Sequence, residues 1–248
     1  MQQPARQSAP STHPPRPAAS PSPRATLGRE VHRQLRELLV TGVLSPGEKL
    51  SLRTIAARLG VSVQPVREAV SRLVADRALE VLPNRAVRVP VLTRPQFREL
   101  TVIRLAIEGF AVQQAAETRT TVDLKAIRTA ARVFRRERAR TTPDLAVAVA
   151  SNQALHFAVY RAAGLPELLP IIEGLWLRIG PVLNLDMRSN VARVRIGRAH
   201  RCHEDLVAAI AQRDSRAARA ALTADIGEAA RYIESCGVLP EGINGTGR

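Results

Sequence analysis

The sequence predicts a mainly α fold, in which a short helical unit closed by a β-hairpin is followed by an all-α helical bundle. Apolar residues recur at helical spacing over most of the chain from Leu27 onward. Short β-like runs bounded by turn residues occur at one place, between residues 79 and 91. Because 45% of the 248 residues are hydrophobic, the chain can bury a sizeable core.

Composition excludes several classes of protein. The longest unbroken apolar run, 145–150, is far shorter than the ~20 residues of a membrane helix. The first 25 residues contain no apolar segment typical of a signal peptide, so we expect no membrane partner and a cytoplasmic location. Two cysteines, Cys202 and Cys236, are too few for a disulfide scaffold. An aromatic content of 3% argues against base stacking on single-stranded nucleic acid.

The chain is strongly basic, with a formal charge of +15 from 37 basic and 22 acidic residues. Only Lys49 and Lys125 are lysines, so the arginine excess reflects genomic base composition as well as chemistry. The excess is denser over residues 1–94 than after them, which favours a nucleic-acid contact in the first part of the chain.

Composition and helix signals divide the chain into four parts. Residues 1–25 are rich in Pro, Ser, Ala, Gln and Arg and predict a disordered basic tail. Residues 26–92 and 93–236 form the two expected domains, and the polar, Gly-rich segment 237–248 predicts a flexible tail.

Three helices and a hairpin are expected in the first domain. The first helix begins at Leu27 and ends at Gly42, and the second spans about 51–59 between a Ser51 N-cap and Gly60. The third follows Ser62 with Pro65 in its first turn, where no intrahelical donor is lost. Its expected buried face consists of Val66, Ala69, Val70, Leu73 and Val74. Two β-like runs, 79–82 and 86–91, are joined by the turn 83–85.

The second domain is expected to be entirely helical. Thr93 and Gln96 have capping-box spacing, and the helix that they open carries one apolar stripe. The residues of that stripe are Leu100, Ile103, Ile107, Phe110 and Ala111. Further helices are predicted at about 122–138, from 142–144 to Gly164 with Pro143 and Asp144 in the first turn, at 166–180, at 190–212, and at 215–235 after an Asp214 cap.

A helix, a tight turn, a second helix and a hairpin form the layout of a winged helix-turn-helix. The third helix of the domain can enter a major groove with its N-terminal residues at the base edges. The polar or basic candidates for contact are Arg53, Ser62, Gln64 and Arg67, with Asn84 and Arg85 at the hairpin tip. The alternative is that these are ordinary solvated residues of a small helical unit.

Two sequence segments resemble the GntR family of bacterial transcription regulators. Residues 59–69 read Leu-Gly-Val-Ser-Val-Gln-Pro-Val-Arg-Glu-Ala and are followed by Leu73, and residues 42–50 match the family's run between its first two helices. The all-helical remainder resembles the FadR-type subgroup, which has an FCD-like effector-binding domain. The family often has an arginine that reads a base at the position of Val63. Val63 cannot make that contact, although a valine can touch a thymine methyl group.

The resemblance implies a ligand-responsive transcription regulator that acts on double-stranded DNA. It implies a homodimer, whose two-fold symmetry matches a palindromic operator. It also implies a repressor that a small carboxylic acid releases from DNA, in the cytoplasm of a bacterium and associated with its nucleoid.

Polar residues lie among apolar ones on three predicted helices of the second domain. Asn152 and His156 share a helix face with Leu155 and Val159. His203 precedes an apolar stripe at 206, 207 and 210, and Asp225 lies between apolar positions 222 and 229. These groups predict a shared internal polar cavity, while satisfied core residues are the alternative reading.

The resemblance further implies one divalent metal ion, zinc, nickel or manganese. Many FadR-type domains bind it through Asp-x3-His on one helix and a His on each of two later helices. Asn152 and His156 occupy the first motif here, His203 matches the second segment, and Asp225 stands where the last His is expected. Imidazole and carboxylate are sound ligands, whereas an amide oxygen is weaker. A metal-free pocket that binds the effector directly through His156 and His203 is the alternative.

Other candidates for this site are less well supported by the pattern. His200 lies one turn from His203, and Cys202 points elsewhere on the helix. Arg104 and Glu108 form an i, i+4 pair, in which Arg104 is either an anchor for an effector carboxylate or a partner in an internal ion pair.

Two other function classes are alternatives to the regulator. A metal-dependent hydrolase fused to a DNA-binding module needs a general base beside an open metal position, and no spare carboxylate is apparent. A structural nucleoid protein would need no buried polar cavity. The sequence therefore predicts a regulator that is not an enzyme.

Overall fold

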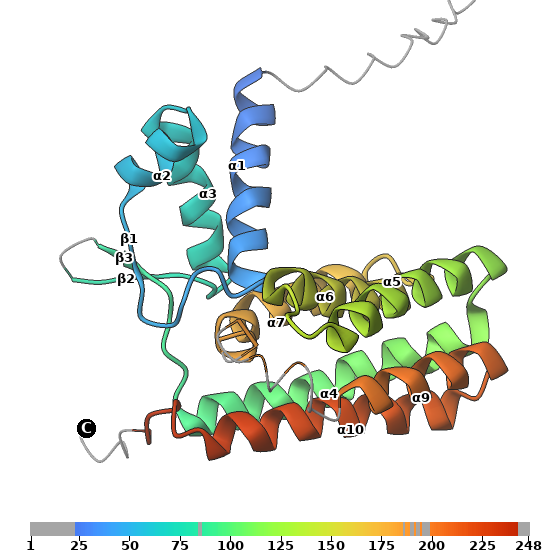
Figure 1. Ribbon diagram of the computed structural model, residues 1–248. Coiled ribbons are helices and arrows are strands. Elements are labelled where there is room, and N and C mark those ends of the chain that lie inside the picture. The colour runs from blue at the N-terminus through green and yellow to red at the C-terminus, as the bar shows by residue number, and fades with distance from the viewer. Residues whose placement is uncertain are drawn as a thin grey trace, which may run out of the picture.

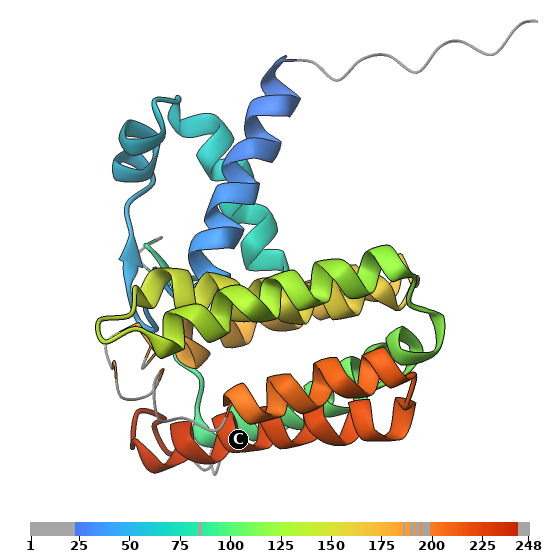
Figure 2. The ribbon, with the colours of Figure 1, turned by 45° about the vertical axis from the view of Figure 1, so that its right-hand side comes forward.

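The computed structural model describes residues 23–83, 86–185, 187–188, 191, 194 and 199–242. Figure 1 shows a small N-terminal head that stands on a bundle of long helices, and Figure 2 shows that the bundle has two layers. The predicted fold class is confirmed. None of the helices in the described ranges is both long and apolar enough to cross a membrane.

The head contains three helices and a small sheet. Its elements are α1 (Pro23–Val40), β1 (Lys49–Leu50), α2 (Leu52–Leu59), α3 (Val63–Ala75), β2 (Glu80–Val81) and β3 (Val87–Arg88). The predicted hairpin is present as β2 and β3, which pair antiparallel, but both strands are shorter than expected. β1 was not predicted. It pairs antiparallel with β3, so that the strand order is β1-β3-β2.

The predicted caps around α2 and α3 are found in the structure with one exception. The Ser51 side chain accepts a hydrogen bond from the Thr54 amide, and Gly60 ends α2 in the left-handed region at φ 63°. Ser62 precedes α3 with extended backbone, but its side chain makes no cap hydrogen bond. The Ser62 hydroxyl therefore has no role in capping α3, and its side chain is exposed.

α1 begins earlier than the sequence predicted. The structure starts the helix at Pro23 instead of Leu27, so three residues of the expected tail 1–25 belong to it. Proline is tolerated at a helix start because its missing N–H would have no partner there. Residues 1–22 lie outside the described part of the chain.

Within the part of the chain that the structure describes, six long helices make up the two layers of the bundle. One layer, next to the head, consists of α5 (Thr121–Ala139), α6 (Leu145–Ala162) and α7 (Leu168–Leu183). The other consists of α4 (Arg94–Thr118), α9 (Ala199–Gln212) and α10 (Ser215–Ser235). The predicted capping box at Thr93 and Gln96 is present, and Asp214 caps α10. Asp144 is the N-cap of α6 and not a residue of its first turn, because its side chain accepts the amides of residues 146 and 147.

The predicted apolar stripe of α4 is partly wrong. Ile103 and Phe110 are 36% and 47% exposed, whereas the charged residues Arg104 and Glu108 are buried. Helical spacing alone favoured the larger apolar side chains as the core face. The structure instead turns an Arg–Glu pair inward, where it meets polar residues of other helices.

Two expected chain segments differ from the structure or lie partly outside it. Within the predicted helix 190–212, the structure describes α9 over 199–212, and most of 186–198 falls outside the described residues. The expected tail from residue 237 packs in its first part, because Leu239 is 4% exposed against Phe97 and Ile233. The Arg94 amide also donates to the Pro240 carbonyl at 2.9 Å. The packed chain therefore extends beyond residue 236.

The head meets the bundle where the end of α1 crosses α7. The Asn184 amide donates to the Val40 carbonyl at 2.7 Å, which satisfies a C-terminal carbonyl of α1. A Cβ at Gly180 would lie 2.8 Å from the Leu39 carbonyl oxygen, so only glycine allows this approach of α1. Arg36 of α1 and Glu173 of α7 form an ion pair at 2.6 Å. These contacts fix the position of the head relative to α7.

Candidate DNA-binding surface and candidate metal centre

The exposed start of α3 is the candidate DNA-binding surface. Ser62, Gln64 and Arg67 are exposed, as is Arg53 on α2. The opposite face of α3 is buried at Val66, Ala69, Val70 and Leu73, as predicted, while Val74 is half-buried. Packing of the apolar face against the head leaves the polar face open to a groove of DNA.

Two residues predicted to contact DNA have side chains that already contact other parts of the protein. Two more lie outside the described residues. The Gln64 side chain donates to Glu68 at 3.1 Å, so this bond must open if Gln64 reads a base. Val63 is half-buried and packs against the core of the head. Asn84 and Arg85, the predicted hairpin tip, lie outside the described residues.

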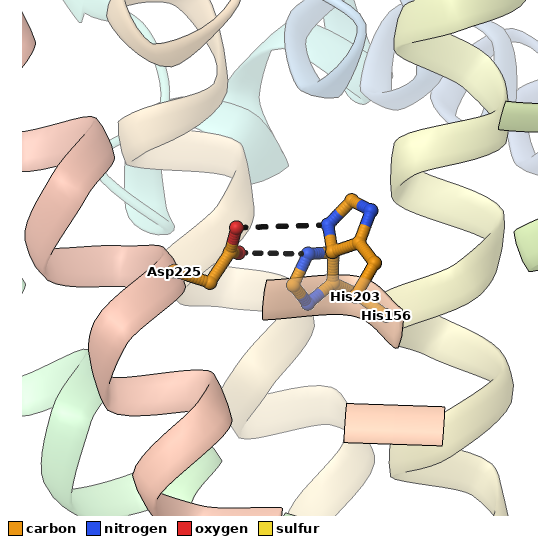
Figure 3. Close-up of side chains that lie close together, drawn as sticks. All are labelled: His156, His203 and Asp225. Atoms are coloured by element: carbon orange, nitrogen blue, oxygen red, sulfur yellow. Dashed lines mark ion pairs between the residues drawn. The ribbon is translucent and has the colours of Figure 1, made fainter. Parts of the chain in front are cut away.

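The bundle brings three predicted metal ligands together between its layers. Figure 3 shows His156 of α6, His203 of α9 and Asp225 of α10 turned toward one another. Their ligand atoms all lie within 4.8 Å of one another. His156 Nε2 lies 3.3 Å from Asp225 Oδ2, and His203 Nε2 lies 3.6 Å from Asp225 Oδ1. Residues far apart in the sequence thus converge on one carboxylate.

Asn152, the fourth predicted ligand, lies on the wall of a small cavity of about 40 Å³ beside this cluster. Asn152, His156 and Asp225 line it together with Arg104 of α4 and Trp176 of α7. The predicted alternatives lie elsewhere. Cys202 is buried, and burial together with nearby carboxylates raises the pKa of its thiol, which keeps it protonated.

A buried hydrogen-bonded chain leads from Arg104 to His156. Arg104 Nε donates to Glu108 Oε1 at 2.7 Å, and its guanidinium lies over the Trp176 ring at 5.4 Å. Tyr160 donates its hydroxyl proton to Glu108 Oε2 at 2.5 Å, and His156 Nδ1 lies 3.2 Å from the same hydroxyl. Burial alone would lower the pKa of Arg104, but Glu108 outweighs it and raises that pKa. The guanidinium therefore stays charged.

This chain determines the protonation of the His156 ring. The single hydroxyl proton of Tyr160 is used on Glu108, so Tyr160 can only accept from His156, and Nδ1 must carry a proton. Burial and the Glu108 charge raise the pKa of Tyr160 well above its usual value, so the phenol keeps that proton. In a neutral ring Nε2 then presents a lone pair to Asp225 Oδ2. Two acceptors at 3.3 Å require a proton or a cation between them.

His203 is neutral and has no hydrogen-bond partner among the described residues. Burial lowers its pKa to about 4, with the charges of His156 and His200 acting in the same direction and Asp225 opposing them. Neither ring nitrogen finds a hydrogen-bond partner in the described ranges. Burial alone would raise the pKa of Asp225, but the two histidines outweigh it and lower that pKa. An ionised carboxylate thus faces two imidazole nitrogens, a donor set that suits a divalent cation.

Sequence reasoning missed three residues that organise this region. Tyr160 holds the His156 ring, Trp176 packs on it at 5.4 Å between ring centroids, and Asn184 joins α7 to the head. Tyr160 continues the 152, 156, 160 spacing on one helix face, a pattern that could have revealed it. No local pattern marks Trp176 or Asn184, because their partners come from other helices.

Two family patterns match the chain, one to each domain. "Bacterial regulatory proteins, gntR family" matches residues 27–89, and "FCD domain" matches residues 99–228. The chain is 35% identical over 159 residues to the HTH-type transcriptional regulator McbR of Escherichia coli K12, covering 64% of this chain and 71% of McbR. The chain belongs to the GntR family and has an FCD effector domain.

Other relatives and solved structures agree with this assignment. The transcriptional repressor RspR of E. coli K12 is 33% identical over 95 residues, covering 38% of this chain and 42% of RspR. The solved structure of E. coli McbR/YncC has a TM-score of 0.78 at 30% identity, covering 85% of this chain and 98% of that one. A putative GntR regulator from Rhodococcus sp. RHA1 has a TM-score of 0.69 at 23% identity, covering 85% of this chain and 98% of that one, and shares the fold.

The protein is therefore a ligand-responsive, DNA-binding transcription regulator. Its family is one of regulators and not of enzymes. The head supplies the contact with DNA, and the FCD bundle supplies the site for a small-molecule effector.

Proposed function

We propose that this regulator represses transcription as a homodimer on a palindromic operator and that a small carboxylate releases it. We further propose that the bundle holds one divalent metal ion, zinc, nickel or manganese, between His156, His203 and Asp225. The observation that supports the metal ion is the arrangement of hydrogen-bond acceptors in the cluster. His156 Nε2 and Asp225 Oδ2 face each other at 3.3 Å, and the ring of His203 lacks a hydrogen-bond partner in the described chain.

Each residue of the cluster has a distinct part in this proposal. The two imidazoles and the carboxylate hold the ion, and the amide oxygen of Asn152 is a weaker fourth ligand. A bound divalent ion supplies positive charge that attracts the carboxylate of an effector. Glu108 and Tyr160 keep the His156 ring in one orientation, as outer partners of metal ligands do.

Arg104 is a second contact for an effector carboxylate in this proposal, beside His156 and His203. It lines the small cavity with His156, and its guanidinium keeps its charge. Its ion pair with Glu108 fixes it in place, so a carboxylate would share it with Glu108. The cavity of about 40 Å³ must widen to admit an effector. An effector that binds better to a widened state shifts the protein toward that state.

Helix α7 supports a direct route from the cluster to the head. It places Trp176 against His156 and carries Glu173 and Gly180 at the junction with α1. A shift of α7 on effector binding moves α1 and with it the DNA-binding surface. In a dimer, this changes the spacing of two heads on a palindrome.

On DNA, we propose that Arg53, Ser62, Gln64 and Arg67 contact bases or phosphates of the major groove. Val63 would touch a thymine methyl group, which its half-buried position still allows at the helix start. Asn84 and Arg85 are proposed as wing contacts. The location that fits this role is the bacterial cytoplasm, at the nucleoid.

The metal is tested by calorimetric titration of chelator-stripped protein with zinc and nickel, alongside metal content as purified. The wild-type protein should bind, and His156→Ala should retain no metal, because one imidazole, a carboxylate and an amide cannot outcompete buffer. His32→Gln, a change in the head, should leave binding unchanged. Asp225→His with Asn152→Asp should bind most tightly, since it supplies a third imidazole and keeps one carboxylate. The proposal is wrong if the wild type binds neither metal and the double variant gains nothing.

Native mass spectrometry of protein purified without chelator tests the proposed dimer and the proposed small-molecule ligand. It should show a dimer with one ion per subunit and reports any carried-over ligand. A hydrolase with the same metal is disfavoured because the two carboxylates that the described residues place at the cluster are engaged, Glu108 with Arg104 and Tyr160, and Asp225 with the histidines. A turnover assay with esters and lactones should therefore show no metal-dependent hydrolysis.

A further inference from the structure

A groove between α5 and α9 lies on the outer side of His203, away from the small central cavity. It has a volume of about 380 Å³, within the range of small-molecule sites. The two helices supply its walls, and Phe134 and His203, whose rings pack at 4.8 Å, form its buried part. His156 and Asp225 do not line it, which makes it a separate feature of the bundle.

One wall of the groove carries three arginines. Arg128, Arg132 and Arg135 occur at spacings of four and three, so they share one face of α5, and all three line the groove. Like charges at these spacings destabilise a helix. No ion pair with a residue in the described ranges relieves them, and Glu204 is the one carboxylate among the lining residues. The wall therefore has an excess of positive charge.

The rest of the lining is apolar except for His200, His203 and Glu204. Ala131 and Phe134 of α5 face Val207, Ala208 and Ala211 of α9. A guanidinium pairs well with a carboxylate or a phosphate in bidentate geometry, and an apolar floor accepts a hydrocarbon or aromatic body.

We propose that this groove is a binding site for a small organic anion, with a carboxylate or phosphate held by Arg128, Arg132 and Arg135 and an apolar body on Phe134 and the α9 wall. It is additional to the central effector site and does not depend on the metal. The ring of His203 belongs to both places, because it lines the groove and its Nε2 lies 3.6 Å from Asp225 Oδ1. An anion in the groove therefore lies directly beside the central cluster.

The experiment is calorimetric titration of the full-length protein with phenyl phosphate, and with benzyl alcohol as the uncharged counterpart. The wild type should bind phenyl phosphate and not benzyl alcohol. Arg132→Gln, the central arginine of the three, should weaken binding about tenfold, since it removes a charge-assisted hydrogen bond. Arg136→Gln is the matched control, because it removes the same charge from an exposed position of α5 outside the groove. It should change the affinity less than twofold.

Further arms separate the groove from other sites. Asp225→Asn alters the central cluster and should leave phenyl phosphate binding unchanged. Circular dichroism melting of each variant checks that it folds. The proposal is overturned if the wild type does not bind, if both arginine variants lose affinity equally, or if Asp225→Asn abolishes binding while Arg132→Gln does not. It is also overturned if Arg132→Gln weakens binding of a random DNA duplex and has no effect on phenyl phosphate, since the arginines would then contact DNA.

Discussion

The head and the bundle place their polar side chains in opposite ways. Among the described residues of the head, every buried side chain is apolar. Of the residues described in the bundle, eight that are polar or charged are buried: Arg104, Glu108, Glu137, Ser151, Asn152, His156, Asn184 and His203. Burial of a polar group is costly unless it is paired. The head thus exposes the polar groups of the candidate DNA-binding surface, whereas the bundle buries those of the candidate metal centre.

The buried polar groups of the bundle differ again among themselves. Arg104, Glu108 and Tyr160 satisfy one another through short hydrogen bonds. His203 has none with any described residue and relies on a carboxylate at 3.6 Å. A buried polar group that has its hydrogen bonds stabilises the fold, whereas one that lacks them can bind a ligand. The paired half, Arg104, Glu108 and Tyr160, holds the ring of His156, and the unpaired half, His203 with Asp225, is where the proposed ion would lie.

The largest effect on stability is expected from breaking the buried pair of Arg104 and Glu108. Glu108→Ala leaves the Arg104 guanidinium buried, at 5% exposure, without its carboxylate. Loss of one partner of a buried pair costs about 3–5 kcal/mol, so the free energy of unfolding in urea should fall by that amount. Glu37→Ala, which removes the exposed ion pair with Arg33, is the control and should cost at most about 1 kcal/mol. Equal losses would contradict the paired role of Glu108.

The unpaired histidine, His203, should make the stability of the metal-free protein depend on pH. The pKa of His203 falls from 6.5 to about 4 on folding, chiefly through burial. Between these values the unfolded chain binds a proton that the native protein does not, so stability falls as the pH falls. The loss amounts to about 3 kcal/mol from pH 7 to pH 4. Urea unfolding at several pH values measures it, and His203→Gln should flatten the slope in this window. An unchanged slope in that variant would rule out His203 as its source.

A smaller effect is expected at the junction between the two regions. In Gly180→Ala the new Cβ would lie 2.8 Å from the Leu39 carbonyl oxygen and the Val40 Cα, so α1 must shift. Such overpacking costs about 1–3 kcal/mol. Gly174→Ala on the same helix meets no atom within 4 Å and should stabilise the helix by about 0.5–1 kcal/mol. Opposite signs in thermal unfolding would confirm that α1 rests on α7. A stabilising Gly180→Ala would show that it does not.

The smallest effect on stability is expected at the surface of the head. Arg67→Ala removes an exposed side chain and should change the free energy of unfolding by less than about 0.5 kcal/mol. Affinity for an operator selected from a random duplex pool should fall by about 1–3 kcal/mol if Arg67 contacts a base edge. Arg72→Ala removes an equal charge at the far end of α3 and should weaken specific binding less. Equal losses on operator and random DNA would reduce Arg67 to a phosphate contact.

Much of the fold was predictable because its signals are local. The Ser51 cap, the glycine at 60 and the Thr93 capping box each act within a few residues, and all are found where the sequence placed them. β1 was missed because two residues carry no periodicity, and because its partner residues in β3 lie far along the chain, 37 residues after Leu50 and 39 residues after Lys49. The inward face of α4 was misjudged because the further partners of the Arg104–Glu108 pair, Trp176 and Tyr160, are on other helices.

The sequence by itself determined the helices, their order, the exposed start of α3 and the buried positions of His156 and His203. These follow from spacing along one chain, where residues three and four apart share a face. Only the tertiary structure decided that His156, His203 and Asp225 meet within 4.8 Å, that Tyr160 sets the proton on His156, and that α7 carries the cluster to the head. Distances between side chains on different helices depend on how the helices pack, and that packing is the sum of many weak apolar contacts with no local signature.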